Sequence, residues 1–108
     1  MGNAMTDREL LEAAAKAAGL RAKWEPFSDG ERLRASPDGN WWPTWNPLES
    51  DGDALRLAVK LRIHFETTEG HSWASTERVD AIEPFGADPY AATRRAIVRA
   101  AAAIGWAR

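Results

Sequence analysis

Apolar residues recur at helical spacing in three parts of the chain, and the first of these predicts a helix over residues 6–18. Thr6 and Glu9 stand at the spacing of a capping box, in which the hydroxyl accepts from the backbone of Glu9 and the carboxylate reaches back. Leucines and alanines then follow on one helical face. Gly19 is expected to end the helix, because glycine readily adopts the left-handed conformation after the last turn.

Two further helices are expected, one in the middle of the chain and one at its end. The middle helix begins at Ser50 or Asp51, where early carboxylates interact favourably with the helix dipole. The last helix has Asp88 as its N-cap and Pro89 in its first turn, a position that tolerates proline. Gly105 is expected to end it.

Alternation of apolar and polar residues between the helices predicts two β-hairpins. The first covers residues 20–36 and the second covers residues 63–82. For the second we favour a three-residue loop, residues 68–70, over a two-residue loop. The longer loop sets Phe65 opposite Trp73, and an aromatic cross-strand pair is stabilising.

The elements therefore read αββαββα, an α+β fold in which an antiparallel sheet of about four strands, formed by two hairpins, packs with three helices. A length of 108 residues corresponds to one domain, residues 1–108. Residues 1–5 are expected to be a disordered extension.

Composition excludes several classes of function. The net charge of −2, from 14 basic and 16 acidic residues, argues against a polybasic protein that coats nucleic acid. The absence of cysteine excludes disulfide scaffolds, thiol catalysis and thiolate metal sites. No apolar stretch is long enough to span a bilayer, and no secretory signal is evident, so we expect a cytoplasmic protein.

No catalytic or metal-binding motif is evident, and we expect neither an enzyme nor a bound cofactor or metal. His64 and His71 lie close in sequence to two glutamates, but in the favoured register the two imidazoles point to opposite faces of the hairpin. Asp51 and Asp53 form a carboxylate pair whose position at a helix start is explained by capping.

Tryptophan is the most unusual feature, because a domain of this size can hardly bury six indoles. Trp41 and Trp42 are adjacent in a proline-rich stretch, so in extended backbone they cannot face the same side. One interpretation is that Trp41 or Trp45 fills the core and its neighbour lies at the rim. The other is a binding surface made by Trp41, Trp42, Trp45 and Asn46, because tryptophan is enriched among binding hot spots.

An alternative function uses the basic residues of the last helix. Arg94, Arg95 and Arg99 lie there with a single acidic residue, and guanidinium groups beside exposed indoles suit single-stranded nucleic acid. Cations near a helix C-terminus also simply suit its dipole, and the chain as a whole is acidic. Nucleic acid is therefore the less favoured partner.

Several stretches resemble small proteins encoded by tailed phages and bacterial prophages, and more loosely the small α/β sandwich domains described in phages. The stretches are WNPL at residues 45–48, DGDALRLAVKL at 51–61 and DPYAATRRAIVRA at 88–100. The resemblance implies a bacterial host cytoplasm and an accessory role in infection or lysogeny, but no reaction or ligand. The leading hypothesis is thus an accessory protein that acts by binding protein, a second copy of itself included.

Overall fold

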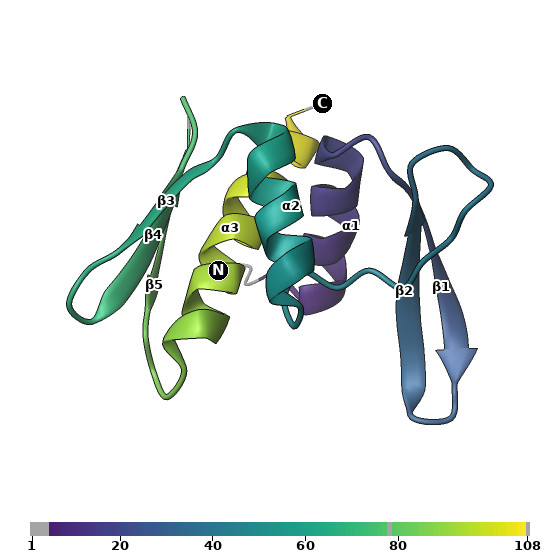
Figure 1. Cartoon of the computed structure of the whole chain (residues 1–108), viewed down its shortest axis with the longest axis horizontal. Coiled ribbons are helices and arrows are strands. Elements are labelled where there is room, and N and C mark those ends of the chain that lie inside the picture. Colours follow the sequence, from purple (N-terminus) through teal and green to yellow (C-terminus); the bar gives the residue numbers. More distant parts are fainter. Residues whose placement is uncertain (1–4, 78, 108) are drawn as a thin grey trace.

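Three helices form the centre of the molecule, and two small β-sheets lie at its opposite ends (Figure 1). The computed structural model describes residues 5–77 and 79–107. The order of elements is αββαβββα: α1 (Asp7–Ala17), β1 (Arg21–Phe27), β2 (Gly30–Ser36), α2 (Asp51–Leu61), β3 (His64–Thr67), β4 (His71–Ser75), β5 (Asp80–Pro84) and α3 (Pro89–Trp106).

The predicted helix starts are confirmed by their caps. The Thr6 hydroxyl accepts from the backbone of Glu9 at 3.1 Å, and the Glu9 carboxylate accepts from the Thr6 backbone at 3.0 Å. The Thr6 backbone N–H and the Thr6 hydroxyl both donate to the Glu9 carboxylate, and these two bonds lower its pKa. Ser50 caps α2, and Asp88 caps α3 with a proline following it. All these contacts are local in sequence, which is why the pattern of residues predicts them.

Helix α3 packs against α1, against α2 and against the three-stranded sheet. The prediction that it ends at Gly105 is wrong, because α3 continues through Trp106. Gly105 is buried inside the last turn, directly against the backbone of Ala13 in α1. It serves close helix packing and does not terminate the helix.

The α+β class is confirmed, but the five strands form two separate sheets instead of one sheet of about four strands. The reason is visible in Figure 1: the helices stand between the hairpins, which cannot then hydrogen-bond to each other. The first sheet, β1 with β2, is the predicted hairpin over residues 20–36. The stretch expected as one returning strand, residues 71–82, divides into β4 and the start of β5, so β3, β4 and β5 follow one another in order.

The favoured register of the second hairpin is wrong. Phe65 pairs with Ala74, and Glu66 pairs with Trp73, so the aromatic pair does not form. The Thr68 N–H donates to the His71 carbonyl at 2.9 Å. The loop between them therefore has two residues, 69 and 70, and not the three residues that the sequence analysis favoured. A one-residue slip reverses which side chains face the core. The buried face of β4 is taken by Ser72 and Ala74, which pack toward α3, and Trp73 consequently points away from the helices.

Two further expectations were a disordered extension at residues 1–5 and the absence of a membrane-spanning segment. Met5 is half-buried against the hydrophobic core, so it does not belong to a disordered extension, and residues 1–4 lie outside the described residues. Within residues 5–77 and 79–107, no helix has both the length and the apolar character that a bilayer span requires.

Candidate functional site

Trp41 is the most exposed of the six tryptophans, with 66% of its surface accessible. Its neighbour Trp42 is half-buried, and Trp45 is buried in the core with 9% exposed. This difference in exposure agrees with the expectation that Trp41 and Trp42 do not face the same side. Trp106, at the end of α3, is half exposed.

The loop that carries Trp41 is held by a network of short-range hydrogen bonds. The Asp38 carboxylate accepts from the backbone of Asn40 at 2.8 Å and of Trp41 at 3.1 Å. These bonds lower the pKa of Asp38. The buried Ser36 hydroxyl accepts from the Gly39 N–H at 2.7 Å. The exposed indole is thus presented by a preorganised loop, which reduces the conformational entropy lost when a partner binds.

Trp42 and Trp45 anchor the same loop to the β1–β2 sheet. The Trp42 indole donates to the Gly39 carbonyl at 3.1 Å, and the Lys23 ammonium lies 4.4 Å from its ring centre. The backbone of Trp45 donates to Leu33 at 3.0 Å, so this segment pairs with the second edge of β2. Both residues were predicted to bind a partner. These contacts show that both residues also hold the loop that carries Trp41.

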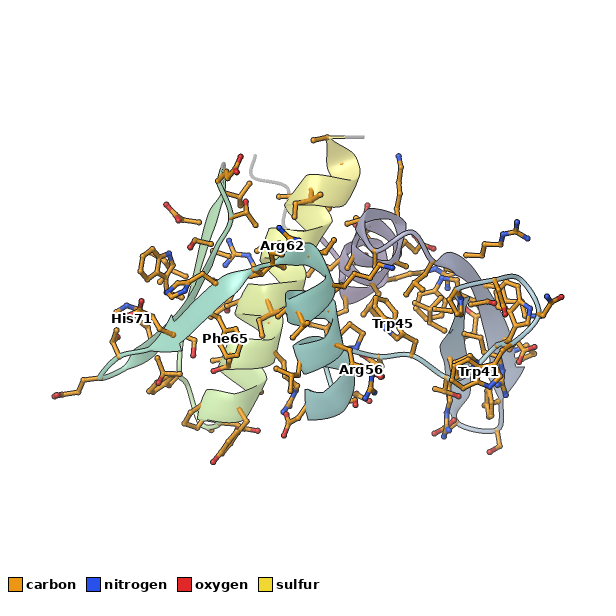
Figure 2. The ribbon with its side chains drawn as sticks, turned by 45° about the horizontal axis from the view of Figure 1, so that its top comes forward. Trp41, Trp45, Arg56, Arg62, Phe65 and His71 are labelled. Carbon is orange, nitrogen blue, oxygen red and sulfur yellow. The ribbon has the colours of Figure 1, made fainter. Side chains whose placement is uncertain are left out.

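An apolar groove of about 530 Å³, here called the Trp41 groove, lies between this loop and α2 (Figure 2). Buried and half-buried residues from the end of α1, from β2, from the loop and from α2 form its floor: Ala18, Leu20, Ala35, Trp45 and Leu57. The volume is in the range typical of ligand-binding clefts, roughly 300–1,000 Å³. Trp41 forms one rim, and Arg56 and Lys60 of α2 form the other.

The α2 rim of the Trp41 groove is basic. Arg56 and Lys60 are one helical turn apart and exposed. Asp53 pairs with Arg56 at 2.7 Å, and its other oxygen accepts from the Asn46 backbone at 2.9 Å. Among the described residues Lys60 has no carboxylate partner. The groove therefore combines an apolar floor with a rim of net positive charge.

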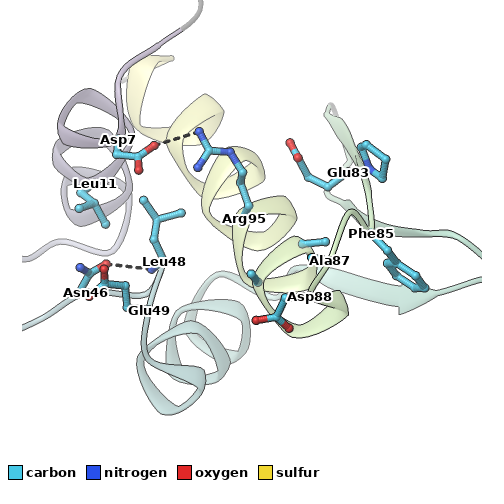
Figure 3. Close-up of a pocket in the computed structure, with 13 residues that line it drawn as sticks. Asp7, Leu11, Asn46, Leu48, Glu49, Glu83, Phe85, Ala87, Asp88 and Arg95 are labelled. Atoms are coloured by element: carbon cyan, nitrogen blue, oxygen red, sulfur yellow. Dashed lines mark hydrogen bonds and ion pairs between the residues drawn. The ribbon is translucent and has the colours of Figure 1, made fainter.

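Asn46, also predicted to bind a partner, has a structural role. Its side-chain oxygen accepts from the Leu48 backbone at 3.0 Å and so shapes the turn before α2. It lines a different cavity, of about 490 Å³, between the first turns of α1 and α3 (Figure 3). Three of the four carboxylates that line that cavity have structural partners: Asp7 pairs with Arg95, Glu83 pairs with Arg99, and Asp88 caps α3.

The three arginines of α3 are each paired with a carboxylate of this chain. Arg94 pairs with Asp51 at 2.7 Å and also donates to the Leu48 carbonyl at 2.9 Å. Arg95 pairs with Asp7 at 2.9 Å, and Arg99 pairs with Glu83. These pairs connect α3 to α1, to α2 and to β5. The guanidinium groups proposed for nucleic acid are thus engaged within the molecule.

The two histidines lie on the same outer face of the three-stranded sheet, because the register differs by one residue from the one favoured by the sequence. His64 hydrogen-bonds to Glu66 at 3.1 Å and packs edge-on against Trp73, whereas His71 contacts Thr68. No group of three or more metal-ligating side chains converges within residues 5–77 and 79–107.

Sequence reasoning identified Trp41 but missed the groove and its basic rim. Arg56 and Lys60 have the i, i+4 spacing that places two cations on one face of α2, and this was the available signal. Comparisons with protein-family models, with curated proteins and with solved structures found no match to this chain. The assignment of function therefore depends on the geometry of the chain itself.

Proposed function

We propose that this chain is a non-enzymatic phage or prophage accessory protein, acting in the host cytoplasm, that binds a segment of a partner protein in the Trp41 groove. One observation carries the proposal: an exposed indole on a hydrogen-bonded loop stands beside an apolar floor. The accessory role itself is implied by the sequence resemblance alone.

The exposed part of Trp41 is large enough to matter energetically. An indole buries roughly 150–250 Å² when fully covered, so the 66% of Trp41 that is exposed corresponds to about 130 Å². At about 25 cal/mol per Å², covering this surface contributes about 3 kcal/mol.

The chemistry of the groove favours a particular kind of segment. The apolar floor suits one bulky apolar side chain, and the ammonium of Lys60, which has no carboxylate partner among the described residues, suits an acidic residue next to it. Nucleic acid is less favoured, because Arg94, Arg95 and Arg99 are already paired with carboxylates of the chain.

A displayed random peptide library tests the proposal. Selection on the wild-type protein is expected to enrich peptides with a bulky apolar residue beside aspartate or glutamate. Trp41→Ala should raise the Kd of the selected peptides by about 30-fold or more, the effect expected when a hot-spot tryptophan is truncated. Trp106→Ala is the matched control, because Trp106 is similarly exposed but lies outside the groove.

NMR of the indole N–H groups adds a direct readout of position. A selected peptide should shift the signals of Trp41 and Trp45 and leave those of Trp73 and Trp106 unchanged. Lys60→Glu should also weaken the binding of acidic peptides, because it places a negative charge on the rim of the groove. If the selected peptides bind Trp41→Ala as tightly as wild type, or if the selection enriches none, the proposed function is wrong.

A further inference from the structure

Strand β3 lies at an edge of the three-stranded sheet, and within the part of the chain that the structure describes its outward backbone groups have no strand beside them. The hydrogen bond from Thr68 to His71 sets the phase of the β3–β4 ladder. In an antiparallel ladder alternate residues point their N–H and C=O groups toward the partner, so His64 and Glu66 face β4. Phe65 and Thr67 therefore direct their backbone N–H and C=O groups to the open edge.

Apolar side chains accompany this open edge. Phe65 is 38% exposed on the helix-facing side of β3, while Leu55 and Val59 of α2 are 53% and 70% exposed. Leu55 and Val59 are one turn apart, and only residues 62 and 63 separate α2 from β3. Figure 2 shows α2 and β3 on the same side of α3, with Phe65 labelled between them. An added strand at this edge would extend the sheet toward the uncovered face of α2.

We infer that the edge of β3 pairs with β3 of a second copy of this chain, antiparallel about a twofold axis, with Phe65 opposite the Phe65 of that copy. This inference is independent of the Trp41 groove, which is formed by other residues. Natural sheets blunt free edges with lysine, proline, bulges, charges or short strands; β3 is short and carries Glu66, but it contains no lysine, proline or bulge.

Self-complementarity selects the second copy and also the register. Only outward-facing residues can form a hydrogen-bonded pair across the new edge, so Phe65 can face Phe65 or Thr67 of the other copy. If Phe65 faces Phe65, each His64, which already hydrogen-bonds to Glu66 of its own chain at 3.1 Å, faces the Glu66 of the other copy, and no two carboxylates are directly opposite each other. If Phe65 faces Thr67, the two Glu66 carboxylates face each other, and like charges directly opposite are destabilising. The register with Phe65 opposite Phe65 is therefore favoured.

This pairing is isologous, as expected for the commonest kind of homodimer. It brings the Phe65 rings together on the inner face of a continuous sheet, beside Leu55 and Val59 of each copy. Because each copy contributes a strand of four residues, the contact is small, and the dimer should dissociate on dilution.

Cysteine cross-linking tests the register sharply, because the chain contains no cysteine of its own. In a hydrogen-bonded antiparallel pair the two Cα atoms lie about 5.5 Å apart, which is within the usual disulfide range. Phe65→Cys should therefore form a disulfide-linked dimer under mild oxidation. Thr67→Cys should not, because the twofold axis at residue 65 places the two copies of residue 67 far apart. Ile82→Cys is the control for random collision, since Ile82 is exposed on β5.

Light scattering of the wild-type protein across a dilution series should show the mass rising from monomer to dimer with concentration. Phe65→Asp should keep the wild-type circular dichroism, because the side chain is partly exposed, and should remain monomeric. Trp41→Ala should dimerise normally, which separates this surface from the groove. A wild-type protein that is monomeric at all concentrations overturns the inference. So does cross-linking of Phe65→Cys no faster than that of Thr67→Cys or Ile82→Cys.

Discussion

Replacing Gly105 with alanine tests the packing of α1 against α3. A Cβ added at Gly105 would lie 2.0 Å from the carbonyl oxygen of Ala13 and 2.8 Å from its carbonyl carbon. Real Cβ atoms essentially never approach other heavy atoms closer than 3.0 Å. The two backbones would have to separate by about 1 Å or more, because a backbone oxygen cannot turn away as a flexible side chain can.

Two effects of opposite sign decide the result. Alanine is favoured over glycine inside a helix by about 1 kcal/mol. Forcing extra volume into a well-packed contact costs about 1–3 kcal/mol and occasionally more. Because the clash is with backbone, we take the upper end of this range and expect Gly105→Ala to lower the free energy of unfolding by about 2 kcal/mol. For a domain of this size that corresponds to a fall in Tm of about 10 °C.

Urea and thermal unfolding followed by circular dichroism measure the effect, and Gly52→Ala is the matched control. Gly52 is also helical, but a Cβ there would meet only the flexible Arg56 guanidinium, at 3.2 Å or more. We expect Gly52→Ala to stabilise the protein by about 0.5 kcal/mol. If Gly105→Ala is as stable as wild type, α1 and α3 do not approach as closely as described, and the reasoning is refuted.

Two further variants address the ion pairs of α3 and the loop of Trp41. Arg94→Met should lower the free energy of unfolding by about 1–3 kcal/mol, because it removes the donor to the part-buried Leu48 carbonyl. Arg95→Met should lower it by less than about 1 kcal/mol, because the Arg95 side chain is more exposed than that of Arg94. Equal losses in urea titrations would contradict this. The pKa of Asp38 is lowered from its ordinary value of 3.8, so its ionised form stabilises the fold above that pH, and this contribution is lost as pH falls through the lowered pKa. The difference in urea midpoint between wild type and Asp38→Ala should therefore shrink as the pH is lowered from neutral to below 3.8. A difference that stays constant with pH would contradict the hydrogen bonds from Asn40 and Trp41 to the Asp38 carboxylate.

The candidate site was only partly predictable. Adjacent tryptophans in extended backbone must point to opposite sides, so an exposed Trp41 or Trp42 followed from the sequence. Which of the two is exposed depends on the sheet, because Lys23 and Gly39 hold Trp42. The apolar floor of the groove joins residues from four segments, and no local pattern brings them together.

The arginines of α3 show the same limit for electrostatics. In the sequence they form a basic cluster, and their partners are up to 88 positions away along the chain. Whether such a cluster attracts phosphate or is paired internally depends on which carboxylates the fold places beside it. Arg95 pairs with Asp7, the first residue of α1, and Arg94 pairs with Asp51, the first residue of α2.

The sequence by itself determined the helices and the first hairpin, because caps, helical periodicity and turn residues act over a few neighbouring positions. Thr6, Ser50 and Asp88 each satisfy backbone N–H groups within three residues. Only the tertiary structure decided that the strands form two sheets and that β3 and β4 pair one residue out of the favoured register. The two sheets are separate because the helices stand between the hairpins. The register follows from packing against α3, because a strand turns toward the core the face that buries more surface, and that choice depends on residues distant in the chain.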